Sequence, residues 1–350
     1  MSALPWHREL QVAQEAVVRA ARLTKGVLST VTQVSKEDAS PVTVADFAAQ
    51  ALLISILRDA FPGVGFVGEE DSAVLRADDR LLARVFELFS AAAGGVHSVQ
   101  EMLDLIDLGG RGTGGSEGRY FVMDPVDGTA AFLKGEQYAV SLALVQDGQE
   151  MLAVVAYPNL KLDAAGRIRE SSIDTDGLGI MLFAVAGQGA HMAVLSSADA
   201  RLEPSPLPQL QPPSTPADTH IVDCDLNRAS SRATMRELAT RLGAPFPGTD
   251  VWSSHVRYAA LIIGGGDVLI RIPSKERSRS CIWDHVGAQL IFRELGGVVT
   301  DLDGRPMNFG AGRYLSENRG LLAAKKEIHE QVLLLARELI PDPERPAPAA

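Results

Sequence analysis

Four groups of acidic residues lie where expected helices and strands begin or end. They are Asp46, the pair Glu69 and Glu70, the pair Asp124 and Asp127, and Asp284. Carboxylate oxygens are the hard ligands that Mg²⁺ prefers in proteins. If the fold brings these groups together, the sequence supplies the ligands of a magnesium site.

The segment 124–129, with the sequence DPVDGT, directly follows an apolar strand. Its proline and glycine favour a tight turn, which can aim the carboxylates of Asp124 and Asp127 at one point. Gly128 and Thr129 open the next segment with free N–H groups, which are suited to bind an anion. Cation ligands beside anion-binding amides indicate a site for magnesium and phosphate.

Each acidic group also has an ordinary structural interpretation, and taken one by one the groups leave it open. The segment 124–129 has the composition of a solvated turn. Asp284 is suited to cap a helix, and Asp46 to compensate the dipole of a helix in its first turn. Glu69 and Glu70 fit a solvated strand end. The combination of all four groups favours the metal site.

Zinc and redox chemistry find little support in the residue pattern. His255 and His285 fit helix-surface or core positions, and no pair of histidines or cysteines has the spacing of a zinc site. The two cysteines, Cys224 and Cys281, are far apart and match no disulfide framework. We therefore expect neither a zinc centre nor redox catalysis.

Helices packed on an antiparallel sheet are expected to position the first three acidic groups. Apolar residues recur at helical spacing early in the chain, and short apolar runs bounded by turn residues follow. Thr43 is a candidate N-cap after an extended segment at 40–43, and residues 147–148 mark a hairpin. The expected helices span 9–28, 45–60, 79–93 and 99–108, and the expected strands span 64–67, 120–123, 138–145, 151–157, 181–185 and 191–195.

A proline-rich stretch divides this half from an α/β half that carries Asp284. Six prolines fall between residues 204 and 216, where helical and strand periodicity is weak. We expect an N-terminal lobe over 1–200, a linker over 201–217, a C-terminal lobe over 218–340 and a disordered tail over 341–350. In the second lobe the expected helices span 231–242, 254–263 and 283–295, and the expected strands span 220–222, 268–272 and 298–300.

Composition restricts the classes of partner. The 350 residues are 46% hydrophobic and 22% charged, which excludes a disordered chain. A net charge of −11 disfavours binding to nucleic acid through phosphate neutralisation. No apolar run reaches the roughly 18 residues of a membrane span, and the first residues lack the pattern of a secretory signal. We expect an intracellular, cytoplasmic protein with a small-molecule ligand and no membrane partner.

The acidic groups and their neighbours resemble the motif set of the inositol monophosphatase superfamily, in order and in spacing over almost the whole chain. Further segments are similar to its 3'(2'),5'-bisphosphate nucleotidase branch. The superfamily motifs match at 40–46, 67–70, 123–129, 282–285 and 294–301, and the branch motifs at 132–139, 157–160 and 308–313.

The resemblance implies an α+β fold of two lobes, in alternating α/β/α/β/α layers, with the active site between the lobes. It also implies two or three Mg²⁺ ions that activate water, so that no covalent nucleophile is needed. Glu69, Asp124 and the carbonyl of Val126 would hold one ion, Asp124, Asp127 and Asp284 a second, and Asp46 with Glu69 a third. Thr129, paired with Asp46, would orient and deprotonate the attacking water, and the amides of Gly128 and Thr129 would bind the phosphate.

On the nucleotide side the resemblance assigns Ser254, Arg257 and Arg271 to the substrate. Without it, Arg257 would be interpreted as part of a solvated helix face and Arg271 as part of an ion pair at a strand end. The chain departs from the branch at 229–232, where ASSR replaces the usual His-Ser-Ser-His, and at 130–131, where two alanines replace Lys-Gly. Specificity for adenine nucleotides is therefore left open.

The activity implied is Mg²⁺-dependent hydrolysis of the 3'-phosphate of 3'-phosphoadenosine 5'-phosphate or a related bisphosphate nucleotide, a reaction of sulfur metabolism. Sensitivity to Li⁺ and a monomeric or homodimeric state go with it. One alternative is a phosphatase whose pocket is adapted to an inositol phosphate or another small phosphate ester. A second alternative is a non-catalytic protein that binds a metabolite.

Overall fold

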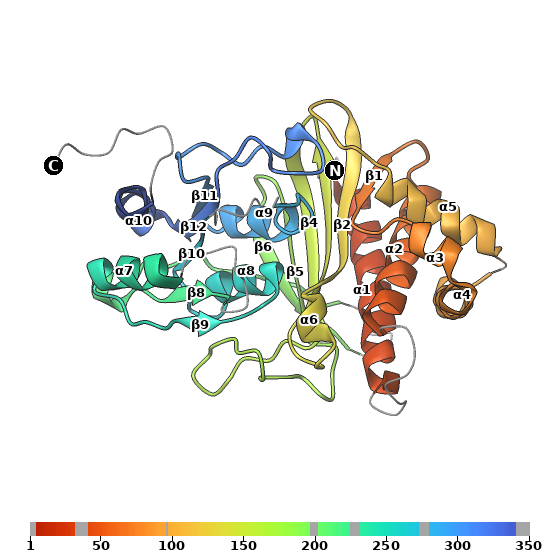
Figure 1. The fold of residues 1–350 in the computed structure, drawn as a ribbon, viewed down its shortest axis with the longest axis horizontal. Coiled ribbons are helices and arrows are strands. Elements are labelled where there is room, and N and C mark those ends of the chain that lie inside the picture. The colour runs from red at the N-terminus through yellow and green to blue at the C-terminus, as the bar shows by residue number, and fades with distance from the viewer. Residues whose placement is uncertain are drawn as a thin grey trace.

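Two β-sheets alternate with three layers of helices across the molecule (Figure 1). The computed structural model describes residues 5–31, 41–95, 97–196, 202–224, 232–272 and 280–340. The alternation confirms the expected α/β/α/β/α fold. From right to left in Figure 1 the helices are α1 (His7–Val31) and α2 (Pro41–Ala60), then α8 (Ser254–Ile262) and α9 (Val286–Glu294) between the sheets, then α7 (Arg232–Leu242) and α10 (Lys326–Leu339).

The first sheet has seven strands, which lie side by side in chain order. Among the strands of this sheet in the described residues only β1 and β2 run parallel, so the sheet is mixed and not wholly antiparallel as expected. The predicted hairpin at Asp147 and Gly148 is confirmed, with φ of 51° and 75°. The strands are β1 (Gly65–Gly68), β2 (Arg119–Asp127), β3 (Ala139–Gln146), β4 (Gln149–Tyr157), β5 (Ile180–Val185), β6 (Ala190–Val194) and β7 (Ser205–Pro206).

The second sheet has five strands in the order β11-β12-β10-β8-β9. Its strands are β8 (Ile221–Asp223), β9 (Thr249–Asp250), β10 (Val268–Arg271), β11 (Gly297–Thr300) and β12 (Leu321–Lys325). Neither β12 nor α10 was expected from the sequence. The apolar run of β12 passes into α10 without a glycine or proline between them, so periodicity gives no boundary there.

Three apolar clusters fill the spaces between the five layers. Leu52 and Phe121 lie in the cluster between α1, α2 and the first sheet. Val155 and Phe292 lie in the cluster between the sheets, and Ile270 belongs to the cluster under α7 and α10. Because helices cover both faces of the first sheet, its central strands are buried on both sides. This explains their nearly continuous apolar sequence.

Several helix boundaries differ from the expected ones. α2 begins at Pro41 and not after Thr43, since proline fits the first turn of a helix, where no backbone donor is needed. α9 begins at Val286 and not at Trp283. α4 (Asp79–Ala93) agrees at both ends, and α5 (Val99–Gly110) is longer than expected by two residues. Two short helices, α3 (Ala73–Ala77) and α6 (Thr129–Phe132), were not expected.

The expected linker at 201–217 contributes to the first sheet. Within it β7 pairs with β6, and a 3₁₀ helix, η1 (Pro216–Asp218), precedes the second sheet. The lobe boundaries stay a prediction. The tail at 341–350 and residues 229–231 lie outside the described residues. None of the described helices combines the length and apolar character needed to cross a membrane.

Candidate active site

A β-bulge brings two of the predicted ligands to the same side of the first sheet. Asp124 pairs with Ser141 and Asp127 with Ala139, so three steps along β2 match two steps along β3. In a regular strand, residues three positions apart point to opposite faces. The extra residue at Pro125–Val126 removes this alternation. The predicted tight turn is therefore wrong: the chain stays in the sheet through Asp127 and bulges.

A third carboxylate joins these two from a distant part of the chain. Asp284 lies just before α9, whose N-cap is His285. Asp124, Asp127 and Asp284 each offer an oxygen, and these three oxygens lie within 4.8 Å of one another. The structure thus gathers three of the predicted ligands, two from β2 and one from the segment that leads into the helix layer between the sheets.

Carboxylates of the site, including those of Glu69 and Asp46, raise one another's pKa. Desolvation raises the pKa of Asp124 well above its usual range, and the negative charges of Glu69, Asp127, Asp284 and Asp46 raise it further. Desolvation and the neighbouring carboxylates also raise the pKa of Glu69 to about 8 and that of Asp284 to about 7. Glu69 nevertheless keeps contact with solvent at the edge of the cluster. A positive ion would relieve this repulsion.

Two buried oxygens of the cluster lack a partner among the described residues. Oδ1 of Asp46 and Oδ1 of Asp124 are inaccessible to solvent and accept no hydrogen bond. Buried carboxylate oxygens are normally paired, so these two atoms fit ligands of a cation. The donor set consists of oxygens, which suits a hard divalent ion such as Mg²⁺.

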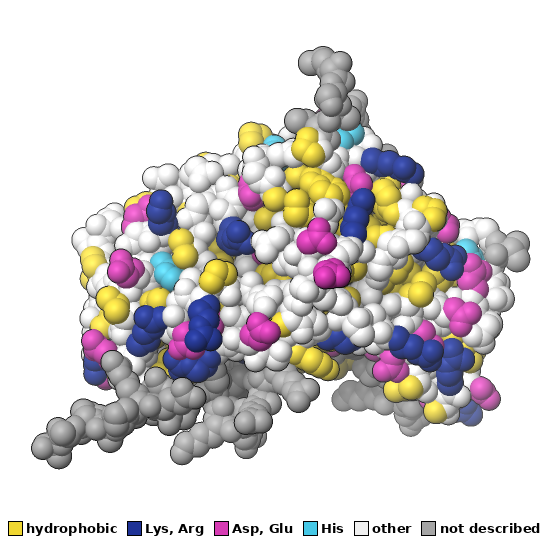
Figure 2. Space-filling model, turned by 90° about the horizontal axis from the view of Figure 1, so that it is seen from above, with side chains coloured by type: hydrophobic (Ala, Val, Ile, Leu, Met, Phe, Trp, Pro, Cys, Tyr) yellow, Lys and Arg dark blue, Asp and Glu magenta, His cyan; other side chains and the backbone are white. Residues whose placement is uncertain are grey.

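Acidic residues are not gathered in this way on the face shown in Figure 2. There, basic and acidic side chains are interspersed, with apolar side chains between them. At the site, in contrast, the carboxylates of Asp124 and Asp127 are buried and converge with that of the partly exposed Asp284. The site therefore differs from this face in the way its acidic side chains are grouped.

The N-terminus of α8 fixes the carboxylate of Asp127. Oδ2 accepts hydrogen bonds from Ser253 Oγ and from the backbone N–H of His255, both at 2.6 Å, and Oδ1 accepts one from Ser254 N–H at 3.2 Å. Ser253 also caps α8. His255 Nε2 lies 2.8 Å from the carbonyl of Trp283, next to Asp284. The start of α8 therefore ties the ligands on β2 to the ligand before α9.

The roles of Ser253 and His255 were missed from the sequence. His255 was interpreted only as a surface or core histidine. The run of serines ahead of a helix marks an N-cap, but it does not show what else the cap would bind. Asp127 lies more than 120 residues earlier in the chain, so its contact with α8 depends on tertiary structure.

Gly128 joins β2 to α6 in a conformation that favours glycine. Its φ is 95°, and a Cβ atom there would lie 2.8 Å from Cβ of Ser253. At the start of α6 the N–H groups of Ala131 and Phe132 both donate to the carbonyl of Gly128 at 2.9 Å, whereas those of Thr129 and Ala130 come too early in the helix to have a partner within it. Thr129 is exposed, and no hydrogen bond joins it to the unpartnered Oδ1 of Asp46. The pairing of Thr129 with Asp46 stays a prediction.

The predicted nucleotide contacts lie beside the carboxylates. Arg257 is buried, so its interpretation as part of a solvated helix face is wrong, and its Nη2 donates to Ser254 Oγ at 2.9 Å. Arg271 ends β10. The positive charges of Arg271 and Arg257 act against the rise in the pKa of Asp284. Two positive charges therefore act on the acidic cluster.

Comparison with known proteins identifies the family of the chain. Residues 6–340 match the inositol monophosphatase family. A 3'(2'),5'-bisphosphate nucleotidase of Schizosaccharomyces pombe is 37% identical over 341 residues, which cover 93% of this chain and 94% of that protein. One of Emericella nidulans is 36% identical over 357 residues, covering 96% and 99%.

The fold also agrees with a solved structure. Inositol monophosphatase II of Staphylococcus aureus MSSA476 superposes with a TM-score of 0.57 at 18% identity, covering 93% of this chain and 91% of that one. The likeness of sequence to the nucleotidases and the likeness of fold to this structure both extend over nearly the full length. The chain belongs to the inositol monophosphatase family.

Proposed function

We propose that this protein is a Mg²⁺-dependent phosphatase that removes the 3'-phosphate of a bisphosphate nucleotide such as 3'-phosphoadenosine 5'-phosphate. The observation that carries the proposal is the convergence of carboxylate oxygens from Asp124, Asp127 and Asp284, one of which, Asp124, has a buried Oδ1 without a hydrogen-bond partner. The choice of a nucleotide is supported by the names of the relatives, which are bisphosphate nucleotidases at 36–37% identity.

In this proposal the carboxylates divide between two or three ions. Asp124, Asp127 and Asp284 would hold one ion, Asp124, Glu69 and the carbonyl of Val126 another, and Asp46 with Glu69 a third. When bound, Mg²⁺ supplies Lewis-acid stabilisation of the phosphate and lowers the pKa of water. The anchoring of Asp127 by α8 supports this assignment, because it orients the carboxylate without using all of its lone pairs.

The residues around α6 would bind the phosphate and the attacking water. The amides of Gly128 and Thr129 would donate to phosphate oxygens. The Thr129 hydroxyl and the Asp46 carboxylate would orient the water and take up its proton as the new P–O bond forms. Asp46 is suited to this, because its Oδ1 has no other partner and its desolvation raises its pKa. The P–O bond to the 3' oxygen breaks, and that oxygen takes a proton from solvent, to which Asp46 returns the proton that it took from the attacking water.

The two arginines would bind the second phosphate of the nucleotide. A guanidinium group can grip a phosphate through two parallel hydrogen bonds. Arg257 is held in place by Ser254, and the charges of Arg257 and Arg271 both act on Asp284, which supports a place for the second phosphate beside the carboxylates that would face the first. A monophosphate would leave these two charges unused, which favours a substrate with two phosphates.

The direct test is phosphate release from 3'-phosphoadenosine 5'-phosphate and from inositol 1-phosphate, with Mg²⁺ and with a chelator. We expect the bisphosphate nucleotide to give the higher kcat/KM and the chelator to abolish turnover. A preference for inositol 1-phosphate would refute the nucleotide assignment and would make the departure at 229–232 the better guide. Release from neither substrate by folded protein would contradict the proposed activity.

A further inference from the structure

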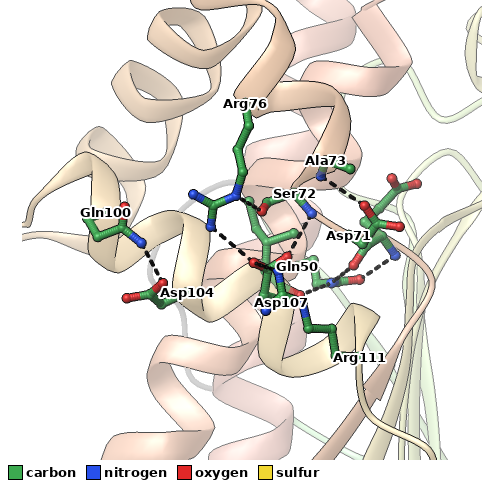
Figure 3. Close-up of polar contacts among 11 residues, drawn as sticks. Gln50, Asp71, Ser72, Ala73, Arg76, Gln100, Asp104, Asp107 and Arg111 are labelled. Atoms are coloured by element: carbon green, nitrogen blue, oxygen red, sulfur yellow. Dashed lines mark hydrogen bonds and ion pairs between the residues drawn. The ribbon is translucent and has the colours of Figure 1, made fainter.

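Glu69 follows β1, and the backbone on its C-terminal side is hydrogen-bonded to the buried side-chain amide of Gln50. Gln50 on α2 is fully buried. Its Nε2 donates to the carbonyls of Glu70 at 2.6 Å and Ile106 at 3.0 Å, and its Oε1 accepts the N–H of Glu70 at 3.0 Å. Figure 3 shows Gln50 between α2 and the segment at Asp71. The residue after Glu69 is thus bonded through both of its backbone polar groups.

The backbone on the N-terminal side of Glu69 is held by an arginine from the opposite end of the chain. Arg313, in the loop between β11 and β12, donates from Nη2 to the carbonyl of Gly68 at 2.6 Å. Its Nη1 donates to the carbonyls of Gly109 at 3.0 Å and Gly112 at 2.8 Å. The partial negative charge at the C-terminus of α5 favours a cation at this point.

The guanidinium group of Arg313 also contacts the segment that carries Asp284. Cζ of Arg313 lies 4.7 Å from the centroid of the Trp283 ring, in a cation–π arrangement. Trp283 precedes Asp284, as Gly68 precedes Glu69. Arg313 therefore contacts the residue before Glu69, at the end of β1, and the residue before Asp284, ahead of α9.

The close approach of these backbones depends on glycine. A Cβ atom at Gly112 would overlap the carbonyl oxygen of Phe66, and one at Gly68 would overlap the amide of Gln50. A larger residue at Gly112 would therefore push the end of α5 away from β1, and one at Gly68 would displace the side chain of Gln50. The carbonyls that Arg313 uses would then no longer converge.

We propose that Gln50 and Arg313 are positioning residues for the metal site: together they fix the backbone on both sides of Glu69, and Arg313 sets its place relative to Asp284. This inference rests on the proposed function, in which both carboxylates are metal ligands. Groups that orient ligands from outside typically change metal affinity or activity by about 10–100-fold when removed. A planar guanidinium can serve three carbonyls and a ring at once, whereas a lysine ammonium cannot.

A neighbouring arginine provides a matched control. In Figure 3, Arg76 donates to Asp107 at 3.1 Å and to Ser72 Oγ at 2.8 Å, and Ser72 N–H donates to Asp107 at 2.9 Å. This network fastens the chain after Glu70 to α5. None of these contacts involves Gly68, Glu69 or Glu70, so Arg76→Ala removes an arginine from the same region without touching the ligand.

The test is calorimetric titration of Mg²⁺ into substrate-free wild type, Arg313→Ala, Arg313→Lys and Arg76→Ala, with circular dichroism as the check of folding. We expect Arg313→Ala to bind Mg²⁺ at least tenfold more weakly, Arg313→Lys to remain at least fivefold weaker, and Arg76→Ala to stay within twofold of wild type. If Arg313→Ala does not fold, Arg313→Lys decides in the same way.

Wild-type affinity in Arg313→Ala, or full recovery in Arg313→Lys, would overturn the inference. The same holds if Arg76→Ala weakens binding as much as Arg313→Ala, since the effect would then be a general loss of structure. A wild type that binds no Mg²⁺ would instead overturn the proposed function, so the two failures are distinguishable. Gln50→Met should likewise weaken Mg²⁺ binding, and wild-type affinity in that variant would remove Gln50 from the proposal.

Discussion

Replacing Asp127 by asparagine should lower the activity of the protein strongly and the stability of its fold only slightly. The carboxylate is buried and accepts three hydrogen bonds from the start of α8. An asparagine keeps the shape but turns one oxygen into an NH₂ group. In either orientation that group faces a backbone N–H, of His255 or of Ser254, and at least one charge-assisted hydrogen bond is lost.

Two magnitudes follow from this geometry. Loss of a hydrogen bond to a charged group costs about 1.5–3 kcal/mol of folding free energy, which lowers the melting temperature by a few degrees but leaves a protein of this size folded. Loss of a charged metal ligand costs about 4 kcal/mol of transition-state stabilisation, or about a thousandfold in rate. Activity should therefore fall far more than stability.

The assay measures phosphate release at saturating Mg²⁺ together with urea unfolding of the same samples. Ser253→Ala is the matched control, because it removes a hydrogen bond to Asp127 and the N-cap of α8 but keeps the carboxylate. We expect it to lose about 2–4 kcal/mol of stability, the sum of a hydrogen bond to a charged group and a helix cap, but less than tenfold in turnover. More than a tenth of wild-type turnover in Asp127→Asn would refute the assignment of Asp127 as a ligand.

Three further predictions concern backbone, substrate and pH. Gly128→Ala should lower the free energy of urea unfolding by more than Gly135→Ala, because both have positive φ but only the first Cβ would meet the α8 N-cap; equal losses would contradict this. Arg257→Ala should lower kcat/KM for the bisphosphate nucleotide by about ten- to a hundredfold and barely change kcat/KM for inositol 1-phosphate. Equal losses of kcat/KM on both substrates would show that Arg257 does not contact the second phosphate. In metal-free protein the pKa values of Glu69 (about 8) and Asp284 (about 7) lie above those of the unfolded chain, so the folded state binds more protons. The stability they contribute is complete below about pH 4 and is lost as pH rises through 7–8. Scanning calorimetry should therefore show a melting temperature that falls between pH 6 and pH 8.5 and recovers with Mg²⁺ at pH 8.5, and a metal-free value that rises with pH would refute the sign.

Elements with clear boundary residues could be predicted from the sequence. α4 agrees at both ends because Asp78 caps its start, accepting from Arg80 and Leu81, and Gly94 ends it. β12 was missed because it runs into α10 without a break. The bulge in β2 was mistaken for a turn, since Pro125 and Gly128 suit both, and only pairing with β3 decides between them.

The site was predictable in residue type and less so in geometry. Carboxylates at element ends indicated a cation, and the structure brings three of them together. The support for these carboxylates comes from far along the chain: the α8 cap holds Asp127, and Arg313 lies 245 residues from Gly68. Such contacts depend on how the layers pack, which local periodicity does not encode.

The convergence of carboxylates on a hard divalent ion can be tested most directly by anomalous diffraction from crystals soaked in Mn²⁺. We predict a strong peak in coordination contact with Asp124, Asp127 and Asp284, and a second in contact with Asp124 and Glu69. A site without anomalous density, at a Mn²⁺ concentration that supports full activity, would contradict the account.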